Sequence, residues 1–357
     1  MPNHMFSAAC SNSPSSSTNL LWSFLWIPLL ISLSIELPYV NAQSSIIMLP
    51  TEPDSEAAFP SSPRCLAPDA NLNFRPVIGI LSHPGDGASG RLKNGTGVSY
   101  IAASYVKFVE SAGARVVPLV YTDHPGVLLR VWVKDQNFLG LNICCKQNIW
   151  LTALSDSSSG RKLDLVNGVL FTGGSAKSGL YFDVVGLIFK KVLEKNDAGQ
   201  FFPCYAICLG FELLAMVVSK DNNILERFNA SYMASTLQFV EGTSIEGTVF
   251  ERFPPDLLRK LNTECLVMQN HKYGISPGTL RGNQRLSCFF NILTTSADED
   301  DKVYVSTAQA HHYPITAFQW HPEKNAFEWG YSMIPHSEDA VQVTQNVANF
   351  FIRKKTG

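Results

Sequence analysis

Short apolar runs alternate with helix-like segments through the middle of this chain, and the alternation restricts the fold more than any other feature. The runs lie at residues 76–81, 115–120, 168–171 and 203–207. Their length and almost wholly apolar character are typical of strands that are buried on both faces. The sequence therefore predicts strands that lie in the interior of a sheet.

The segments between these runs have helical periodicity. We expect helices at residues 99–112, 180–194 and 211–219, with Gly113 closing the first of them. After Lys220 the pattern favours strands at 237–240, 248–250 and 266–268, and a last helix is predicted at 337–352. Because strands and helices alternate, we predict an α/β fold of three layers, with a mostly parallel sheet and helices on both faces.

Cys208 is the first candidate for chemistry in such a sheet, where ligands bind at the carboxyl ends of the strands. It follows the run 203–207 and precedes Leu209, Gly210 and a helix. A tight turn at this place would present the thiol as a nucleophile elbow presents its serine, and the helix N-terminus would lower the pKa of the thiol. The alternative is a buried core cysteine, an interpretation that suits Cys204 better.

His321 and Glu323 form the second half of the predicted site. They lie in the segment Trp320-His321-Pro322-Glu323, directly after an apolar stretch that ends in a strand-like pattern. A histidine at a strand end can accept the proton of a thiol, and a carboxylate two residues later can orient its ring. Cys208, His321 and Glu323 together have the composition of a nucleophile, base and orienter triad, which predicts acyl transfer through a thioester.

Four further positions are assigned around this triad. Gly174 and Leu209 could offer backbone N–H groups to an oxyanion, although a plain turn before a helix would also explain the glycines. Gly173 and His271 are predicted to contact the substrate. The pair His311-His312 is interpreted as part of a surface loop.

Composition excludes several other classes of function. The formal net charge is −2, so no basic field favours nucleic acid. No glycine-rich phosphate loop and no Cys-x-x-Cys pair occurs, which argues against a nucleotide or zinc site, and we expect no cofactor and no metal.

The N-terminal part of the chain is predicted to be processed. Residues 20–37 are apolar and precede Val40-Asn41-Ala42, so we expect a signal peptide at 1–42, with an uncleaved membrane anchor as the alternative. No later run has the ~20 apolar residues that a membrane span requires. Residues 43–74 are interpreted as a linker or propeptide and residues 75–357 as the catalytic domain. Sequons at Asn94 and Asn229 predict a glycoprotein of the secretory pathway.

One segment does not fit this organisation. Residues 127–162 separate two predicted core strands by more than most strand–helix connections do, and they show no clear periodicity. We interpret the segment as an insertion that a surface loop can accommodate, with impaired folding as the alternative.

Four segments give the sequence a family resemblance. Residues 80–86, 206–212, 269–273 and 318–324 resemble, in this order, motifs of the plant gamma-glutamyl hydrolases, which are related to the class I glutamine amidotransferases. The resemblance implies a flavodoxin-like fold and a secreted enzyme of the vacuole, extracellular space or cell wall. It also implies the substrate, folylpoly-gamma-glutamate, and frequently a homodimer.

By position, the resemblance assigns Cys208 as the nucleophile, His321 as the base, Glu323 as its orienter and His271 as a substrate-side histidine. Glutaminases of the related class carry Gln where this chain has Glu212, and this difference favours a hydrolase. Two alternatives stay open: a folded but inactive glycoprotein disabled by the insertion, and a gamma-glutamyl transferase on the same fold.

Overall fold

The computed structural model describes residues 75–85, 99–123, 125–128 and 162–353. The predicted signal peptide at 1–42, the predicted linker at 43–74, the sequon at Asn94 and most of the segment 127–162 lie outside these residues. The domain bounds predicted from the sequence therefore remain predictions.

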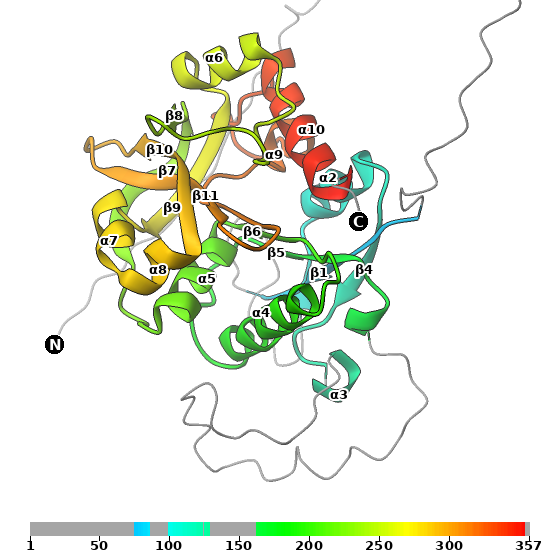
Figure 1. Cartoon of the computed structure of the whole chain (residues 1–357). Helices are drawn as coiled ribbons and strands as arrows, with labels where there is room; N and C mark the ends of the chain where they lie inside the picture. Colours follow the sequence, from blue (N-terminus) through cyan, green and yellow to red (C-terminus); the bar gives the residue numbers. More distant parts are fainter. Residues whose placement is uncertain (1–74, 86–98, 124, 129–161, 354–357) are drawn as a thin grey trace, which may run out of the picture. The chain divides into compact units, whose positions relative to one another are not determined.

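A central sheet organises the described part of the chain (Figure 1). Its strands are β1 (Val77–Leu81), β4 (Arg115–Leu119), β5 (Gly168–Phe171), β6 (Cys204–Ile207), β8 (Gln238–Phe239), β10 (Phe290–Ala297), β11 (Val303–Ala310) and β12 (Ile315–Phe318). They lie in the order β4-β1-β5-β6-β12-β11-β10-β8. The pairs from β4 to β12 are parallel, and the pairs from β12 to β8 are antiparallel.

The parallel strands have the order of a flavodoxin-like sheet. Numbered along the chain as first to fifth, they lie in the order 2-1-3-4-5, which reverses direction between β1 and β5. Ligands bind outside the carboxyl ends of the strands near such a reversal. The predicted fold class is thereby confirmed, and the crevice that it implies lies at the ends of β1, β5 and β6.

Helices cover both faces of the sheet (Figure 1). They are α2 (Ala103–Ser111), α3 (Pro125–Leu128), α4 (Leu180–Asp197), α5 (Leu209–Ser219), α6 (Pro255–Thr263), α7 (Pro277–Gly282), α8 (Gln284–Phe289), α9 (Lys324–Phe327) and α10 (Glu338–Arg353). Helices α4, α5 and α8 pack on one face, and α2, α6 and α10 pack on the other.

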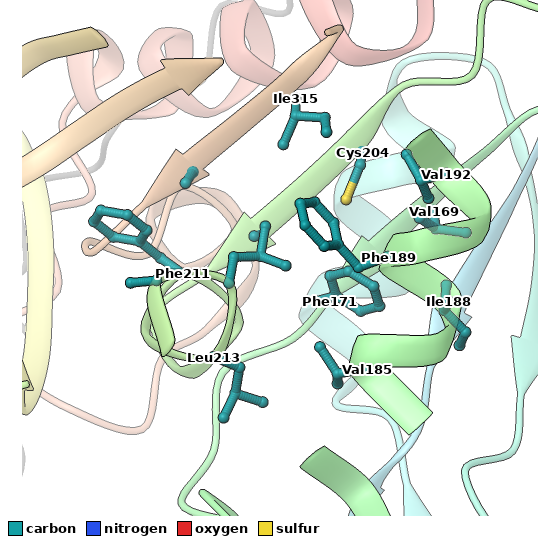
Figure 2. Close-up of a cluster of buried hydrophobic side chains, with 14 of the residues drawn as sticks. Val169, Phe171, Val185, Ile188, Phe189, Val192, Cys204, Phe211, Leu213 and Ile315 are labelled. Atoms are coloured by element: carbon teal, nitrogen blue, oxygen red, sulfur yellow. The ribbon is translucent and has the colours of Figure 1, made fainter. Parts of the chain in front are cut away.

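Alternation along the strands builds the two cores. Val169 and Phe171 of β5 enter the core under α4, whereas Leu170 between them enters the core under α2 and α10. Figure 2 shows the first of these cores, where Cys204 of β6 lies among aliphatic side chains of β5 and α4. Cys204 is fully buried there, and burial raises the pKa of its thiol. It is a core residue, as the sequence suggested.

Two small antiparallel sheets lie beside the central sheet. One pairs β2 (His83–Pro84) with β3 (Ser99–Tyr100), and the other pairs β7 (Glu226–Ser235) with β9 (Val267–Gly274). Strand β9 extends six residues beyond the predicted run 266–268, so His271 lies within a strand and not after one. The first helix also begins later than predicted, because Ser99 and Tyr100 pair with β2.

Residues 248–250 are a turn, and the strand predicted there is wrong. The N–H of Thr248 donates to the carbonyl of Ile245, and the N–H of Glu251 donates to the carbonyl of Thr248. Val249 and Phe250 are fully buried nevertheless. Their apolar side chains fill the core from consecutive turns. An apolar run is therefore not enough to predict a strand here.

The sheet is continuous on both sides of the segment 127–162. Strand β1 pairs with β4, which precedes the segment, and also with β5, which follows it. The Nζ atom of Lys162 lies 2.7 Å from Oδ2 of Asp123, so an ion pair joins the chain before the segment to its last residue. The strands before and after the segment therefore belong to one sheet.

Among the described residues, no helix has both the length and the apolar character that crossing a bilayer would need.

Two glycines within helices predict opposite stability effects. A Cβ atom on Gly210 of α5 would lie 2.8 Å from the carbonyl oxygen of Phe171, whereas a Cβ on Gly186 of α4 would meet nothing closer than 4.0 Å. We expect Gly210→Ala to lower the free energy of unfolding by about 1–3 kcal/mol through overpacking. Gly186→Ala should raise it by about 0.5–1 kcal/mol through helix propensity. Urea denaturation of both variants tests the pair, and equal effects would contradict the close contact of α5 with β5.

Candidate active site

Cys208 occupies a strained turn between β6 and α5. Its backbone has φ 53° and ψ −106°, in the left-handed half of the map that side chains rarely adopt. Its N–H donates to the carbonyl of Phe318 over 2.6 Å, which attaches the turn to the end of β12. Strain of this kind persists where surrounding contacts impose it, and it concentrates at functional sites.

His321 and Glu323 lie directly beyond the end of β12. The His321 Nδ1 atom is 2.7 Å from Oε1 of Glu323, and both side chains are buried. The backbone N–H of His321 donates to Met268 of β9, and the carbonyl of Pro322 accepts from the hydroxyl of Thr344 in α10. The carboxylate fixes the proton on Nδ1, so the buried Nε2, for which no hydrogen-bond partner exists among the described residues, can accept a proton.

Gly173, which follows β5, lies close to both Cys208 and His321. A Cβ atom on Gly173 would lie 3.5 Å from Cβ of Cys208 and 3.0 Å from Cε1 of His321. It would also lie 2.8 Å from the hydroxyl of Tyr105, which accepts the Gly173 N–H over 2.9 Å. The residue therefore leaves room between nucleophile and base, while its own N–H is already used by Tyr105.

The electrostatics of Cys208 differ from the expectation of a lowered thiol pKa. Burial, followed by the charges of Glu212 and Glu323, raises the pKa of Cys208 above that of an ordinary thiol. The N–H of Leu209 at the helix start and the ammonium of Lys177 lower it, but less. The helix effect is thus present and is outweighed. The thiol has to give its proton to a base before it can attack.

His271 faces the same site from β9. Its Nδ1 lies 2.9 Å from the carbonyl of Tyr273, to which it must donate, so Nε2 carries the lone pair. Burial, with a smaller contribution from His321, lowers the pKa of His271 to about 3, although the hydrogen bond to Tyr273 raises it. No described residue accepts or donates at this buried Nε2. A neutral, acceptor-only histidine is the result.

Gly174 and the residues after it pack against His83. A Cβ atom on Gly174 would overlap the His83 ring, with atoms only 2.2–2.7 Å away. The N–H groups of Ser175 and Ala176 point to Nε2 of His83 at 3.2 and 3.3 Å, and its Nδ1 lies 2.5 Å from the Pro84 carbonyl. Glycine is required at this position because the imidazole clamps the loop after β5.

Buried Glu212 and partly exposed Lys177 form an ion pair beside the thiol. Nζ of Lys177 lies 3.0 Å from Oε2 of Glu212, one helical turn after Cys208. The other oxygen of Glu212 accepts from the amide of Gln319 over 3.3 Å. Burial raises the pKa of Glu212, and the charge of Lys177 opposes this shift.

Three residues of this site were not assigned from the sequence. They are His83, Tyr105 and Lys177. Only His83 could have been predicted from the sequence, because it follows the apolar run of β1 and so lies at the carboxyl edge of the sheet that also carries Cys208. Tyr105 fits the periodicity of an ordinary helix. Lys177 is a polar residue in what the sequence presents as an ordinary loop.

The remaining sequence assignments lie elsewhere. Asn229 is an exposed residue of β7 whose amide contacts Glu299 over 3.1 Å. His311 and His312 are exposed in a turn. Within the residues that the structure describes, no group of three or more His, Cys, Asp or Glu side chains could hold a metal ion.

The chain is similar to known proteins over most of its length. Residues 148–338 match the family model described as glutamine amidotransferase class-I. The chain is 53% identical over 332 residues to gamma-glutamyl hydrolase 2 of Arabidopsis thaliana, covering 93% of this chain and 86% of the relative. It is 55% identical over 309 residues to gamma-glutamyl hydrolase 1 of the same plant, covering 87% and 79%. The gamma-glutamyl hydrolase of Mus musculus is 36% identical over 296 residues, covering 82% and 81%.

The lowered pKa of His271 predicts how acid affects stability. The unfolded chain binds a proton here below the ordinary histidine pKa of about 6.5, whereas the folded chain does so only near 3. This contribution to stability is complete above pH 6.5 and is lost progressively as the pH falls. Between pH 7.5 and pH 5 the loss amounts to about 2 kcal/mol.

His271→Gln should therefore lose about 2 kcal/mol less free energy of unfolding than the wild type over the same pH interval. Urea denaturation at the two pH values measures the difference. His312→Gln, at an exposed position, serves as the control and should follow the wild type. An identical loss in wild type and His271→Gln would show that His271 is not held neutral by the fold.

Proposed function

Because the chain belongs to the gamma-glutamyl hydrolases, within the class I glutamine amidotransferase family, we propose that it cleaves folylpoly-gamma-glutamates with Cys208 as the nucleophile. One observation carries the assignment of the nucleophile. Cys208 and His321 approach each other on either side of Gly173, at the carboxyl ends of β5, β6 and β12.

The first step is attack on the carbonyl of a gamma-glutamyl bond. His321 Nε2 takes the thiol proton while sulfur bonds to the carbonyl carbon, and the Glu323 carboxylate stabilises the imidazolium through Nδ1. The raised pKa of Cys208 makes this transfer necessary, since little thiolate exists beforehand. The N–H groups of Gly174 and Leu209 are proposed to stabilise the oxyanion.

The second step releases the amine and then the acid. The tetrahedral intermediate collapses as the protonated His321 gives its proton to the leaving nitrogen, which departs as glutamate or as a short poly-gamma-glutamate. The acyl group remains on sulfur as a thioester. Water, deprotonated by the neutral His321, attacks the thioester and regenerates the thiol. The imidazolium formed in this attack returns its proton to sulfur, and the acid leaves.

The substrate side of the site includes Gly173 and His271. Gly173 leaves space for the scissile group, and the unprotonated Nε2 of His271 can accept a hydrogen bond from an amide N–H of the substrate. The relatives named above are hydrolases, which favours hydrolysis over transfer to another acceptor. The continuous sheet around the insertion favours an active enzyme over a disabled glycoprotein.

The cellular setting follows from the sequence and is proposed with the same function. A signal peptide at 1–42 and glycans at Asn94 and Asn229 would suit an enzyme of the vacuole, the extracellular space or the cell wall. The exposed position of Asn229 supports its use as an acceptor. A homodimer is the proposed assembly.

Replacement of the nucleophile tests this function. We expect Cys208→Ala to lower kcat for a folylpoly-gamma-glutamate by at least ~10³-fold, with an unchanged melting temperature. Mass spectrometry of the products measures chain shortening and would also reveal transfer to added acceptors. Cys265→Ala, at an exposed cysteine, is the matched control and should keep full activity. Full turnover by Cys208→Ala would overturn the assignment.

A further inference from the structure

A gamma-glutamyl group always carries an α-carboxylate, and a buried site that accepts it needs a cation. Two lysines lie close enough to be considered. Lys324, the first residue of α9, is buried. Its ammonium pairs with the carboxylate of Glu328, which directly follows α9. Lys324 lines the same cavity as Tyr105 and Gly173, but only 5% of its side chain is exposed. Lys177 is different, because 29% of its side chain is exposed.

The ammonium of Lys177 contacts two different elements of the fold. It lies 3.0 Å from Oε2 of Glu212 in α5 and 3.8 Å from the centre of the Tyr273 ring in β9. Tyr273 also supplies the carbonyl that orients His271. The charge of Lys177 acts on both Cys208 and His271. The cation therefore contacts the residue one helical turn after the nucleophile and the residue that orients the proposed substrate-side histidine.

The fold fixes this position in advance. Lys177 follows the loop whose N–H groups at Ser175 and Ala176 are held by His83, and close packing of that ring permits only glycine at Gly174. A cation held by a carboxylate and an aromatic face has lost much of its side-chain freedom before a ligand arrives. Such preorganisation is typical of a recognition group.

An ammonium has three N–H donors, and its present contacts do not exhaust them. Glu212 accepts one hydrogen, and the Tyr273 ring covers one side of the group. A carboxylate that enters from the exposed side can take a remaining donor. Glu212 is a buried side chain of the enzyme itself, so its role toward the ammonium of Lys177 is to position it.

We propose that Lys177 binds the α-carboxylate of the gamma-glutamyl unit whose acyl carbon Cys208 attacks, and so makes the enzyme specific for gamma-glutamyl over other acyl groups. This inference rests on the proposed function. It adds a specificity-determining residue, with Glu212 and Tyr273 as the groups that position it.

A matched pair of substrates separates recognition from structure. The first is N-(4-aminobenzoyl)-gamma-glutamyl-glutamate, and the second is the same compound with the α-carboxylate of the inner glutamate converted to a carboxamide. A charge-assisted contact should give the wild type a kcat/KM about 10–100-fold higher for the carboxylate. Lys177→Met should bring the two substrates within about 3-fold of each other, because it slows the carboxylate more than the carboxamide. Loss of the ammonium also raises the pKa of Cys208, which slows both substrates alike. Lys177→Arg should restore part of the preference.

Lys302 offers the control, because it makes the same kinds of contact away from the crevice. Its ammonium lies 3.5 Å from Oε2 of Glu226 and 4.1 Å from the Phe228 ring. Lys302→Met should keep the wild-type preference for the carboxylate.

The outcomes distinguish the two proposals. A Lys177→Met variant that keeps the preference, or that slows both substrates equally, would overturn carboxylate binding by Lys177. A wild type that cleaves both substrates equally well would overturn it too, while leaving gamma-glutamyl hydrolysis intact. A wild type that cleaves neither would contradict the proposed function itself.

Discussion

The parallel pairing of β6 with β12 is the contact on which the site depends. Ile207 lies opposite Phe318 in this pair, and the N–H of Cys208 continues the ladder by donating to the Phe318 carbonyl. Both strands therefore end at the same level of the sheet. The thiol of Cys208 follows the end of β6, and the imidazole of His321 follows three residues after Phe318, so both leave the sheet at one edge. The strained backbone of Cys208 is held by this ladder on one side and by α5 on the other, and the second attachment leaves no room for a side chain at Gly210.

Charged groups at this edge are buried in combinations that keep each of them compensated. Glu323 holds His321, and Lys177 holds Glu212. Burial keeps His271 neutral, and its Nδ1–H donates to the Tyr273 carbonyl. An unpaired buried charge would cost several kcal/mol, whereas a paired one costs far less. The buried Nε2 atoms of His271 and His321 have no hydrogen-bond partner among the described residues, so both can accept from a substrate.

Features that arise from interactions between near neighbours in the sequence were the ones that could be predicted from it. Strands β1, β4, β5 and β6 were readable because burial on both faces leaves an unbroken apolar run. Cys208 and His321 were readable because each follows such a run. The segment 248–250 was misread as a strand, since turns can bury consecutive apolar residues as strands do. Tyr105 and Lys177 had no local signal, because their roles come from Gly173 and Glu212, 68 and 35 residues away in the sequence.

By itself the sequence determined the class of fold, the family and the chemical types available at the strand ends, because hydrophobic periodicity and turn residues are local properties. The strand order, the shared position of Cys208 and His321 around Gly173, the raised pKa of the thiol and the placement of Lys177 were decided only by tertiary structure. The physical reason is that burial, Coulomb interaction and close packing act between groups that are near in space, and only the folded sheet brings them together.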